Sequence, residues 1–469
     1  MIPLTLAELA AAVDGRLAAA DPTVRVTGPV EFDSRKVRPG GLFVAFPGEK
    51  VDGHDYAATA VADGGAVAVL GSRPVDGVPM VLVDDARAAL GRLARAVLDR
   101  LPELTVIGLT GSSGKTTTKD LVAQLTARLG AAVAPPGSFN NELGHPYTAL
   151  QADAETRFLV LEKGARGLGH IRYLCEIAPP RIAVVLNVGV SHIGEFGSQE
   201  AIAQAKGELV EGLPADGLAV LNADDERVRA MTARTAARTV LVGEADDAEV
   251  RAEDVSLDDR GRASYTLVTP EGRAAVRLGV SGRHQVGNSL AAAAVARELG
   301  MPLAELAEAL GGLGLPSTRR MDVFDRTDGV TVIDDSYNAN PASTSAALRA
   351  LAGMGERRRS FAVLGYMAEL GDFERDGHEQ VGRLTAELGI DRLIVVGEPA
   401  APIHDGAVAI AHWGGESVLV TDQAAAVEAL RRELRPGDIV LVKGSRYRTW
   451  EVADALRAEA VPPTGGGAR

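Results

Sequence analysis

The sequence is poor in cysteine and in long apolar runs. Its 469 residues include one cysteine, Cys175, so no disulfide can form within the chain, which is typical of the reducing cytoplasm. No run approaches 18 consecutive apolar residues, which argues against a membrane-spanning helix. The N-terminal residues 1–15 lack a basic region and carry Glu8 and Asp14 at helical spacing. We therefore expect a first helix there and not a signal peptide.

Positive charge is also in deficit. Lysine and arginine number 49 against 63 aspartates and glutamates, which gives a net charge of −14. This balance argues against a protein that coats nucleic acid or an anionic membrane, so we expect neither a nucleic-acid partner nor membrane insertion. A hydrophobic fraction of 46% and a charged fraction of 24% are globular values and exclude a disordered chain. The composition predicts a large, soluble, cytoplasmic protein.

The chain length predicts roughly three domains at about 150 residues each. Short apolar runs separated by turns predict a small α/β unit over residues 1–86, and helical spacing over 85–101 suits a helix that joins it to the next unit. From Leu104 onward, apolar strands alternate with helices, a pattern that indicates a parallel sheet covered on both faces. Residues 250–280 differ, because two strand-like runs separated by Pro-Glu-Gly predict an antiparallel hairpin.

The glycine-rich segment 311–317 reads as a linker, after which strands and helices alternate again. We therefore expect an α/β protein of three domains. These are a small N-terminal α/β domain (1–86), a central domain like a P-loop ATPase with a mostly parallel sheet (87–316), and a C-terminal Rossmann-like α/β domain (317–469). We expect the tail, 462–469, to be disordered.

A phosphate-binding loop follows the strand that begins near Leu104. Gly111 and Gly114 let backbone amides approach phosphate oxygens, and the helix that follows favours negative charge at its N-terminus. Lys115 can reach the terminal phosphates, and the Thr116 hydroxyl can ligate Mg²⁺. A glycine-rich turn without a ligand is the alternative. Leu109 stands where the longer G-x-x-x-x-G-K-[ST] motif has its first glycine, which argues against ordinary GTPases and transport ATPases. The loop residues expected to bind nucleotide are Gly111, Ser112, Ser113, Gly114, Lys115, Thr116 and Thr117.

Two possible metal ligands lie at later strand ends. Glu162 closes the apolar run RFLVLE, and His192 follows the strand-like run RIAVVLNVGVS. Ligands in open parallel sheets bind at the carboxyl ends of the strands, and a carboxylate beside a triphosphate suits Mg²⁺. Each residue alone has a structural alternative, but the pair beside a phosphate loop indicates a metal site.

Lysine is rare, with seven residues against 42 arginines (49 − 7 = 42). The lysines that remain are enriched for positions where a guanidinium cannot replace an amine. Lys206, in a helical run beyond His192, is one such position. An amine with a lowered pKa can react with CO₂, and the resulting carbamate could hold a second Mg²⁺. The alternative is a surface lysine paired with Glu208 or Glu211.

The segment DDSYNANP (334–341) again joins a strand end to a helix. Its aspartates, Asp334 and Asp335, can accept hydrogen bonds from hydroxyls or an ammonium, and Tyr337 can stack on a base. An asparagine-rich helix cap is the equally good alternative from local chemistry.

Taken together, these segments resemble the Mur ligase family over nearly the whole chain. The similarity includes TGSSGKTTTK (110–119), SFNNELGHP (138–146), VSHIGEFGS (190–198), DDSYNANP (334–341) and GYMAELGD (365–372). The phosphate loop is shared with the whole superfamily, including folylpolyglutamate synthases. The last two motifs resemble the members that add D-alanyl-D-alanine to a UDP-N-acetylmuramoyl-tripeptide.

The resemblance implies an ATP-dependent ligase that activates the tripeptide carboxylate as an acyl phosphate and uses one or two Mg²⁺ ions. Lys115 and Thr116 would hold the ATP phosphates and metal, with Glu162 and His192 completing the metal shell and Lys206 matching a lysine that is carbamylated in several members. The resemblance also assigns nucleotide contacts to Asn288, Asp335, Tyr337 and Asn338, and substrate contacts to Ser34, Arg35, Asn140 and Asn141. Lys443 and Arg446 fall in the last family motif without an assigned role.

Two positions depart from the family pattern. Lys163 stands where methionine is common, and we expect it to place a cation beside Glu162. Tyr366 stands where an acidic residue is common. Neither residue is expected to touch the inferred phosphate or metal ligands, so we expect activity to be retained. The alternatives for function are a related ligase with another amino-acid acceptor or polyglutamate, and a nucleotide-dependent switch without ligation. We expect a monomer. Whether the third residue of the tripeptide is diaminopimelate or lysine cannot be read from the sequence.

Overall fold

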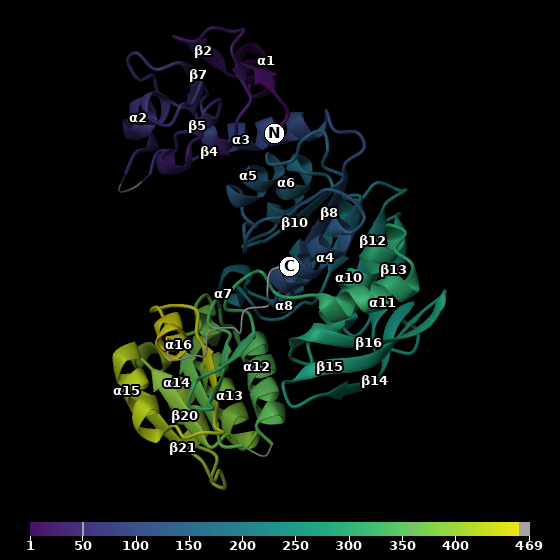
Figure 1. Ribbon diagram of the computed structural model, residues 1–469, viewed down its shortest axis with the longest axis vertical. Coiled ribbons are helices and arrows are strands. Elements are labelled where there is room, and N and C mark those ends of the chain that lie inside the picture. The colour runs from purple at the N-terminus through teal and green to yellow at the C-terminus, as the bar shows by residue number, and fades with distance from the viewer. Residues whose placement is uncertain (49–50, 357, 459–469) are drawn as a thin grey trace.

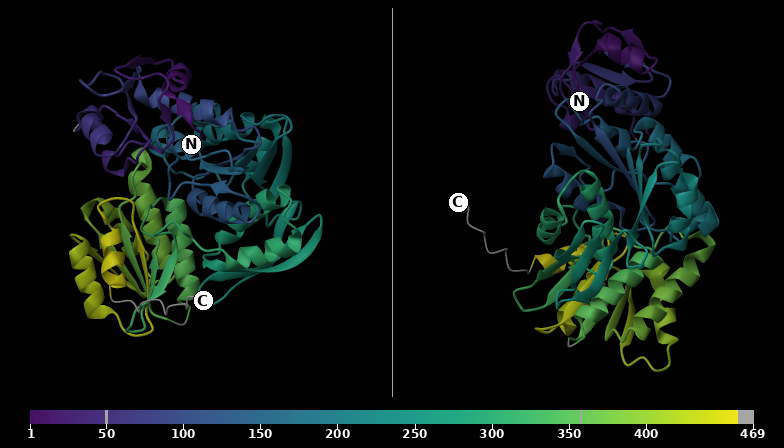
Figure 2. Two further views of the ribbon diagram at one scale, coloured as in Figure 1. Left: turned by 45° about the horizontal axis from the view of Figure 1, so that its top comes forward. Right: turned by 90° about the vertical axis from the view of Figure 1, so that its right-hand side faces the viewer.

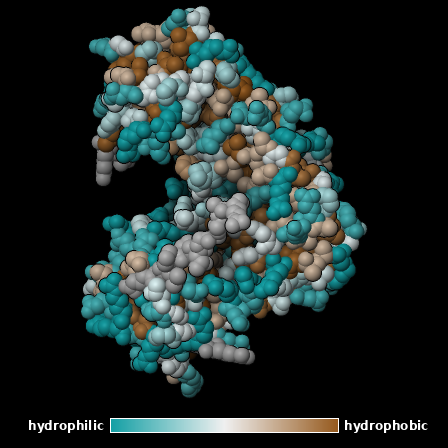
Figure 3. All heavy atoms as spheres, in the orientation of Figure 1, coloured by the Kyte–Doolittle hydropathy of each residue, from teal (hydrophilic) through white to brown (hydrophobic). Residues whose placement is uncertain are grey.

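A computed structural model describes residues 1–48, 51–356 and 358–458, and the expected disordered tail, 462–469, lies outside these ranges. The chain forms three lobes, each built around its own sheet, and the α/β class expected from the sequence is confirmed (Figure 1). The first and third lobes project toward the same side of the central lobe, so the space-filling view shows a deep notch between them (Figure 3).

The first lobe holds a sheet of order β2-β7-β6-β5-β4, in which only the β2–β7 pair is antiparallel. Its first helix, expected from the sequence, begins after Thr5, which forms a reciprocal capping box with Glu8. The elements are β1 (Leu4–Thr5), α1 (Leu6–Ala12), β2 (Arg16–Ala18), β3 (Arg25–Val26), β4 (Val30–Glu31), η1 (Ser34–Lys36), β5 (Leu42–Val44), η2 (Gly53–Tyr56), α2 (Ala57–Ala62), β6 (Ala68–Gly71) and β7 (Met80–Leu82). The joining helix expected over 85–101 is α3 (Ala86–Leu98), which packs on α1 and on α5 and α6 of the central lobe.

The central lobe holds a sheet of order β16-β15-β14-β13-β12-β11-β8-β10-β9. Its strands from β9 to β14 are parallel, and β14, β15 and β16 form the antiparallel patch expected over 250–280. Helices cover both faces, which is why the parallel strands are apolar throughout (Figure 2). The elements up to β13 are β8 (Thr105–Thr110), α4 (Lys115–Ala127), β9 (Ala132–Val133), α5 (Gly144–Ala149), β10 (Phe158–Glu162), α6 (His170–Ile177), β11 (Ile182–Val185), α7 (Ile193–Phe196), α8 (Gln199–Glu211), β12 (Leu218–Asn222), α9 (Glu226–Arg229), η3 (Ala230–Arg234) and β13 (Arg238–Gly243). The remainder are β14 (Val250–Leu257), β15 (Arg262–Thr269), β16 (Gly272–Ser281), α10 (Gln285–Glu298) and α11 (Leu303–Gly312).

The third lobe holds a sheet of order β17-β18-β22-β19-β20-β21, in which only the edge strand β17 is antiparallel to its neighbour. An apolar cluster fills each face of this sheet, so helices cover it on both sides, as they do the sheet of the central lobe. The elements are β17 (Asp322–Asp325), β18 (Thr331–Asp334), α12 (Pro341–Met354), β19 (Ser360–Gly365), η4 (Gly371–Phe373), α13 (Glu374–Glu387), β20 (Arg392–Val396), η5 (Glu398–Ala400), α14 (Ala401–Val408), β21 (Glu416–Val420), α15 (Gln423–Glu433), β22 (Ile439–Lys443) and α16 (Trp450–Arg457).

The glycine-rich segment between the central and third lobes is tied down along α4. Gln124 donates from Nε2 to the carbonyl of Gly314 at 2.9 Å, and the Ser317 amide donates to Asp120 Oδ2 at 3.1 Å. Lys119 pairs with Asp120 and donates to the carbonyl of Pro135. The connection therefore enters the third lobe from a fixed position beside the phosphate loop. Within the described ranges, no helix is both long and apolar enough to cross a membrane.

Candidate functional site

The site lies at the carboxyl edge of the central sheet, where the strand order changes direction. β8 lies between β10 and β11 in the sheet, whereas the next strand along the chain, β9, lies at the edge. The loops that follow β8, β10 and β11 therefore converge at one place. Ligands of open parallel sheets bind at such a point. A cavity of about 1050 Å³ opens there, walled by the central lobe on one side and the third lobe on the other.

The phosphate loop has the geometry expected of an anion cradle. Gly114 adopts a φ of 80° as the N-cap of α4, and a Cβ there would lie 2.6 Å from Asn288 Oδ1. Only glycine fits this left-handed position under the Asn288 amide. Lys115 folds back so that its Nζ donates to the carbonyl of Gly111 at 2.6 Å, and burial lowers its pKa. The N-terminal amides of α4 and the Lys115 ammonium therefore lie together at the cavity wall.

Glu162 lies directly behind this wall. It is the last residue of β10 and is fully buried, with Oε2 accepting a hydrogen bond from Ser138 Oγ at 3.1 Å. Its other oxygen, Oε1, is buried with no hydrogen-bond partner among the described residues. A buried carboxylate oxygen without a donor is costly unless a cation satisfies it. Lys115 is near enough for the charge of Glu162 to raise the lysine's pKa, although burial outweighs that effect.

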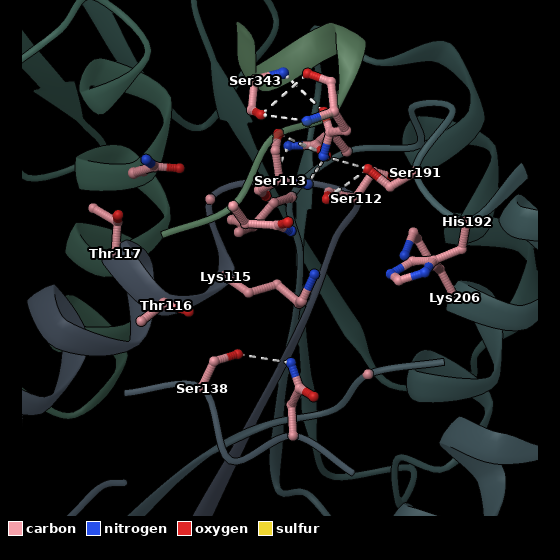
Figure 4. A pocket seen from close by; sticks show the side chains of 18 of the residues that line it. Ser112, Ser113, Lys115, Thr116, Thr117, Ser138, Ser191, His192, Lys206 and Ser343 are labelled. Carbon is pink, nitrogen blue, oxygen red and sulfur yellow. Dashed lines mark hydrogen bonds between the residues drawn. The ribbon is translucent and has the colours of Figure 1, made fainter. Parts of the chain in front are cut away.

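His192 and Lys206 line the cavity on the side of Lys115 away from Thr116 and Thr117 (Figure 4). They are near enough for the charge of Lys206 to contribute to lowering the pKa of His192. His192 has a left-handed φ of 62°, and burial lowers its pKa. Lys206 is buried in α8, and burial together with the nearby Lys115 lowers its pKa well below the usual value.

The surface-lysine alternative for Lys206 is wrong, because both carboxylates proposed to pair with it are engaged elsewhere. Glu208 accepts from the amides of Gly169 and Arg172 at the start of α6, and Glu211 pairs with Arg234. Within the described ranges, no hydrogen bond or ion pair joins Lys206 to another side chain. A buried amine with a lowered pKa therefore lies beside the proposed metal ligands.

The expectation that Lys163 places a cation beside Glu162 is wrong, because successive side chains of a strand point to opposite faces. The Lys163 ammonium instead donates to the carbonyls of Leu174 and Ala178, at 2.8 and 3.0 Å, and lies 2.9 Å from His145 Nε2. Its stem passes over Gly108, where a Cβ would lie 3.0 Å from Lys163 Cε. Lys163 therefore holds the C-terminal end of α6, and burial lowers its pKa to about 8.

The third lobe contributes the loop after β18. Asp335 pairs with Lys443 at the end of β22 and accepts from the Met321 amide at 3.1 Å. Lys443 also donates to the carbonyl of Asn338 at 2.9 Å, so it holds the loop that carries Tyr337 and Asn338 against the cavity. Lys443 thus has a structural role that the sequence did not assign. The asparagine-cap alternative is correct for Asn340, which caps α12.

Most residues predicted to form the site line this one cavity. They are Ser112, Ser113, Gly114, Lys115, Thr116, Thr117, Asn140, Asn141, His192, Lys206, Asn288, Asp335, Tyr337 and Asn338. Gly111 and Glu162 lie just behind the wall and contact residues that line it. Ser34 and Arg35 do not line it. They lie in η1 of the first lobe, where the exposed Arg35 guanidinium pairs with Asp33 at 2.8 Å.

Two residues that the sequence analysis did not single out also line the cavity. Arg320 donates from Nη2 to Thr116 Oγ1 at 3.3 Å, and its guanidinium lies 4.0 Å from the Tyr337 ring centroid. It is flanked by Arg319 and Met321 at left-handed φ values of 60° and 52°. His284 also lines the cavity, near Asp335 and Lys443. The signal in the sequence that could have pointed to Arg320 is the pair of adjacent arginines, Arg319 and Arg320, directly after the linker.

The donor set fits a nucleotide with a magnesium ion. Backbone amides, Lys115 and Arg320 can face phosphate oxygens, while the Thr116 hydroxyl, the unpartnered Glu162 Oε1 and the His192 imidazole are suitable metal ligands. Magnesium is usually held by one or two carboxylates together with substrate phosphates, and this site offers that combination.

Comparisons with known proteins agree with this geometry. Three family models match: "Mur ligase family, catalytic domain" over residues 29–97, "Mur ligase middle domain" over 109–296, and "Mur ligase, glutamate ligase domain" over 319–446. The UDP-N-acetylmuramoyl-tripeptide–D-alanyl-D-alanine ligase of Mycobacterium tuberculosis is 50% identical, with 98% of each chain covered.

Two solved structures have the same architecture. MurF from Acinetobacter baumannii superposes with a TM-score of 0.87 at 32% identity, covering 97% of this chain and 98% of that one. MurF ligase from Thermotoga maritima, solved in complex with ADP, gives a TM-score of 0.80 at 31% identity, covering 92% and 98%.

Proposed function

The chain belongs to the Mur ligase family, and we propose that the cavity between its central and third lobes is where a muramoyl tripeptide is joined to D-alanyl-D-alanine. The enzyme is an ATP-dependent ligase that forms UDP-N-acetylmuramoyl-pentapeptide, a peptidoglycan precursor, with release of ADP and phosphate. The observation that carries the site assignment is the convergence of Lys115, Glu162, His192 and Lys206 at one sheet edge.

The reaction needs a carboxylate to become an electrophile. An oxygen of the tripeptide carboxylate attacks the γ-phosphorus of ATP, the bond to ADP breaks, and an acyl phosphate results. The dipeptide amine, after losing a proton to solvent, attacks the carbonyl carbon, and the tetrahedral intermediate expels phosphate. No protein nucleophile is required, so catalysis rests on positioning and charge neutralisation.

We assign the protein's contribution to four groups. Lys115 and the α4 amides hold the terminal phosphates, and Arg320 adds a second cation beside Thr116. Thr116, Glu162 and His192 would hold Mg²⁺, which when bound neutralises charge between the two reacting anions. Asn288, Asp335, Tyr337 and Asn338 would contact the nucleotide. The third lobe shields the acyl phosphate from water.

We further propose that Lys206 is carbamylated. The unprotonated form of the amine, which burial favours, adds to CO₂, a C–N bond forms, and a proton leaves. The product is a carbamate, whose oxygens could hold a second Mg²⁺. Ser34 and Arg35 in the first lobe would bind the UDP-sugar, with Asn140 and Asn141 near its sugar–peptide part. We propose that the enzyme is a monomer in the cytoplasm. That compartment supplies ATP, and its reducing conditions suit a chain whose one cysteine is free.

The test is phosphate release from ATP in the presence of UDP-N-acetylmuramoyl-tripeptide, with and without D-alanyl-D-alanine. We expect release to require both substrates and mass spectrometry to show the pentapeptide. Separate reactions with tripeptides ending in diaminopimelate or lysine identify the third residue. Release without dipeptide dependence, or with another amino acid as the preferred acceptor, would contradict the proposal.

A further inference from the structure

The loop that carries His192 connects the third lobe to the active site. Ser191 Oγ accepts a hydrogen bond from Asn340 Nδ2 at 2.6 Å and donates to the carbonyl of Ser112 in the phosphate loop at 3.1 Å. The Gly189 amide also donates to Ser112 Oγ at 2.8 Å. The loop over residues 188–197 therefore connects the phosphate loop to the third lobe.

A carboxylate from the third lobe reaches His192 itself. Glu369 Oε2 lies 2.7 Å from His192 Nδ1, while Glu369 Oε1 accepts from Arg446 Nη2 at 3.1 Å and lies 3.8 Å from Arg166 Nη2. Glu369 thus stands among three cationic or proton-donating groups from two lobes. The His192 N–H is not aligned for a hydrogen bond, but the distance is already within hydrogen-bond range, so only the ring angle has to change.

Both residues of this pair have unfavourable backbone conformations. His192 has a φ of 62° and Glu369 a φ of 66°, the left-handed region that side chains with a Cβ seldom adopt. Such residues persist where surrounding contacts hold them, and they concentrate at functional sites. The two strained residues face each other across the junction between lobes.

Two glycines make the close approach possible. A Cβ on Gly194 would lie 2.5 Å from the Gly371 amide nitrogen, and a Cβ on Gly371 would lie 2.5 Å from Gly194 Cα. Gly194 lies in α7 with an ordinary helical backbone, so an alanine there fits the central lobe by itself. The three atoms nearest to the added methyl group all belong to Leu370 and Gly371 of the third lobe, so the clash is with that lobe in its docked position.

We infer that Glu369 is a positioning residue that orients His192 for metal binding only when the third lobe is docked. Histidines that ligate metals usually donate their other ring N–H to a carboxylate, which fixes the tautomer and leaves the second nitrogen for the metal. Here Nδ1 faces Glu369, so Nε2 is the nitrogen that would remain for the metal. Because the carboxylate comes from the other lobe, metal binding and lobe docking favour each other by linkage. This inference rests on the proposed role of His192 as a metal ligand.

The test compares Glu369→Gln and Gly194→Ala with the wild type, using Mn²⁺ in place of Mg²⁺. Titration calorimetry gives the Kd of ADP in EDTA and in saturating Mn²⁺, and the ratio of the two values measures how far the metal tightens binding. Small-angle X-ray scattering in the same solutions reports lobe docking. We expect each variant to lose about tenfold of this ratio, with the Kd in EDTA unchanged in Glu369→Gln, which leaves the nucleotide contacts of the third lobe in place. We also expect less compaction on addition of Mn²⁺ and ADP.

The matched control is Glu379→Gln, which makes the same substitution in the same lobe. Glu379 pairs with Arg375 and Arg383 along α13, which packs against α14 of the same lobe. We expect its ratio to equal that of the wild type. A ratio within twofold of the wild type in Glu369→Gln overturns the inference, and so does a loss in Glu369→Gln that Gly194→Ala does not share. A wild type in which Mn²⁺ fails to tighten ADP binding would instead contradict the proposed metal site.

Discussion

The two junctions between lobes are built from different chemistry. Where the first lobe meets the central lobe, one apolar cluster runs through both and includes Leu93 of α3, Leu161 of β10 and Ile177 of α6. A Cβ on Gly91 of α3 would lie 3.0 Å from Ile177 Cδ1, so the two helices are in close contact. Around the cavity, the third lobe meets the central lobe through Asn340–Ser191 and Glu369–His192, which are polar pairs.

The physical consequence is that the two junctions respond differently to water. Separating the first lobe would expose apolar surface at a cost of about 25 cal/mol per Å². Hydrogen bonds and ion pairs of the third lobe can be replaced by bonds to water at a small net cost. Within the described ranges, the two apolar clusters of the third lobe contain no residue of the central lobe. The first junction is therefore suited to a fixed platform, and the second to a part that docks and releases as substrates exchange.

The largest expected effect comes from removing the cation of the phosphate loop, which belongs to neither junction. Lys115→Met should lower kcat/KM for ATP about 10³-fold, because the charge of the terminal phosphates is then not neutralised. Both junctions should survive, since Lys115 contacts neither. Steady-state kinetics and small-angle scattering measure the two outcomes. Retention of kcat/KM within tenfold would contradict the assigned role of Lys115.

The apolar junction is broken by Ile177→Ala. Ile177 is 4% exposed, so its truncation should lower the free energy of unfolding by about 2–4 kcal/mol. Activity at low temperature should remain near wild type, because the residue lies outside the cavity wall. Urea unfolding at equilibrium measures the first quantity. A loss of activity without loss of stability would mean that this junction also moves during the reaction.

A buried charge beneath the apolar junction gives a pH-dependent test. Lys163 has its pKa lowered to about 8 by burial, so between about pH 8 and 10.5 the unfolded chain holds a proton that the folded chain has released. Stability should therefore rise with pH in this window, by up to about 3 kcal/mol in wild type relative to Lys163→Met. Urea unfolding of both proteins at several pH values gives the difference. A difference that does not change with pH would show that Lys163 is not destabilised by burial.

The smallest effect is expected at the polar junction. Ser191→Ala removes the hydroxyl that joins Asn340 to Ser112 and should lower kcat/KM about tenfold. The free energy of unfolding should change by about 1 kcal/mol or less, because the lobes remain folded when they separate. Kinetics and urea unfolding are measured on the same preparation. A stability loss as large as that of Ile177→Ala would remove the distinction between the two junctions.

Much of the fold and part of the site follow from local patterns. Strand–helix alternation from Leu104, the antiparallel patch over 250–280 and the helix that follows it depend on periodicity and turn residues, which act over short distances. The phosphate loop is predictable for the same reason, because its strand, glycines and helix are contiguous. Arg320 could not be placed, since its importance depends on a linker that brings it to Thr116 across 204 positions of sequence.

By itself, the sequence determined the α/β class, the phosphate loop and the candidate ligands Glu162, His192 and Lys206, because residue type and spacing carry that information. Only the tertiary structure decided the surroundings of each group. It put Lys163 on the face opposite Glu162, gave Lys443 to Asp335 and brought Glu369 to His192. Burial and charge pairing depend on which chain segments meet in space, and those contacts are set by the packing of whole lobes.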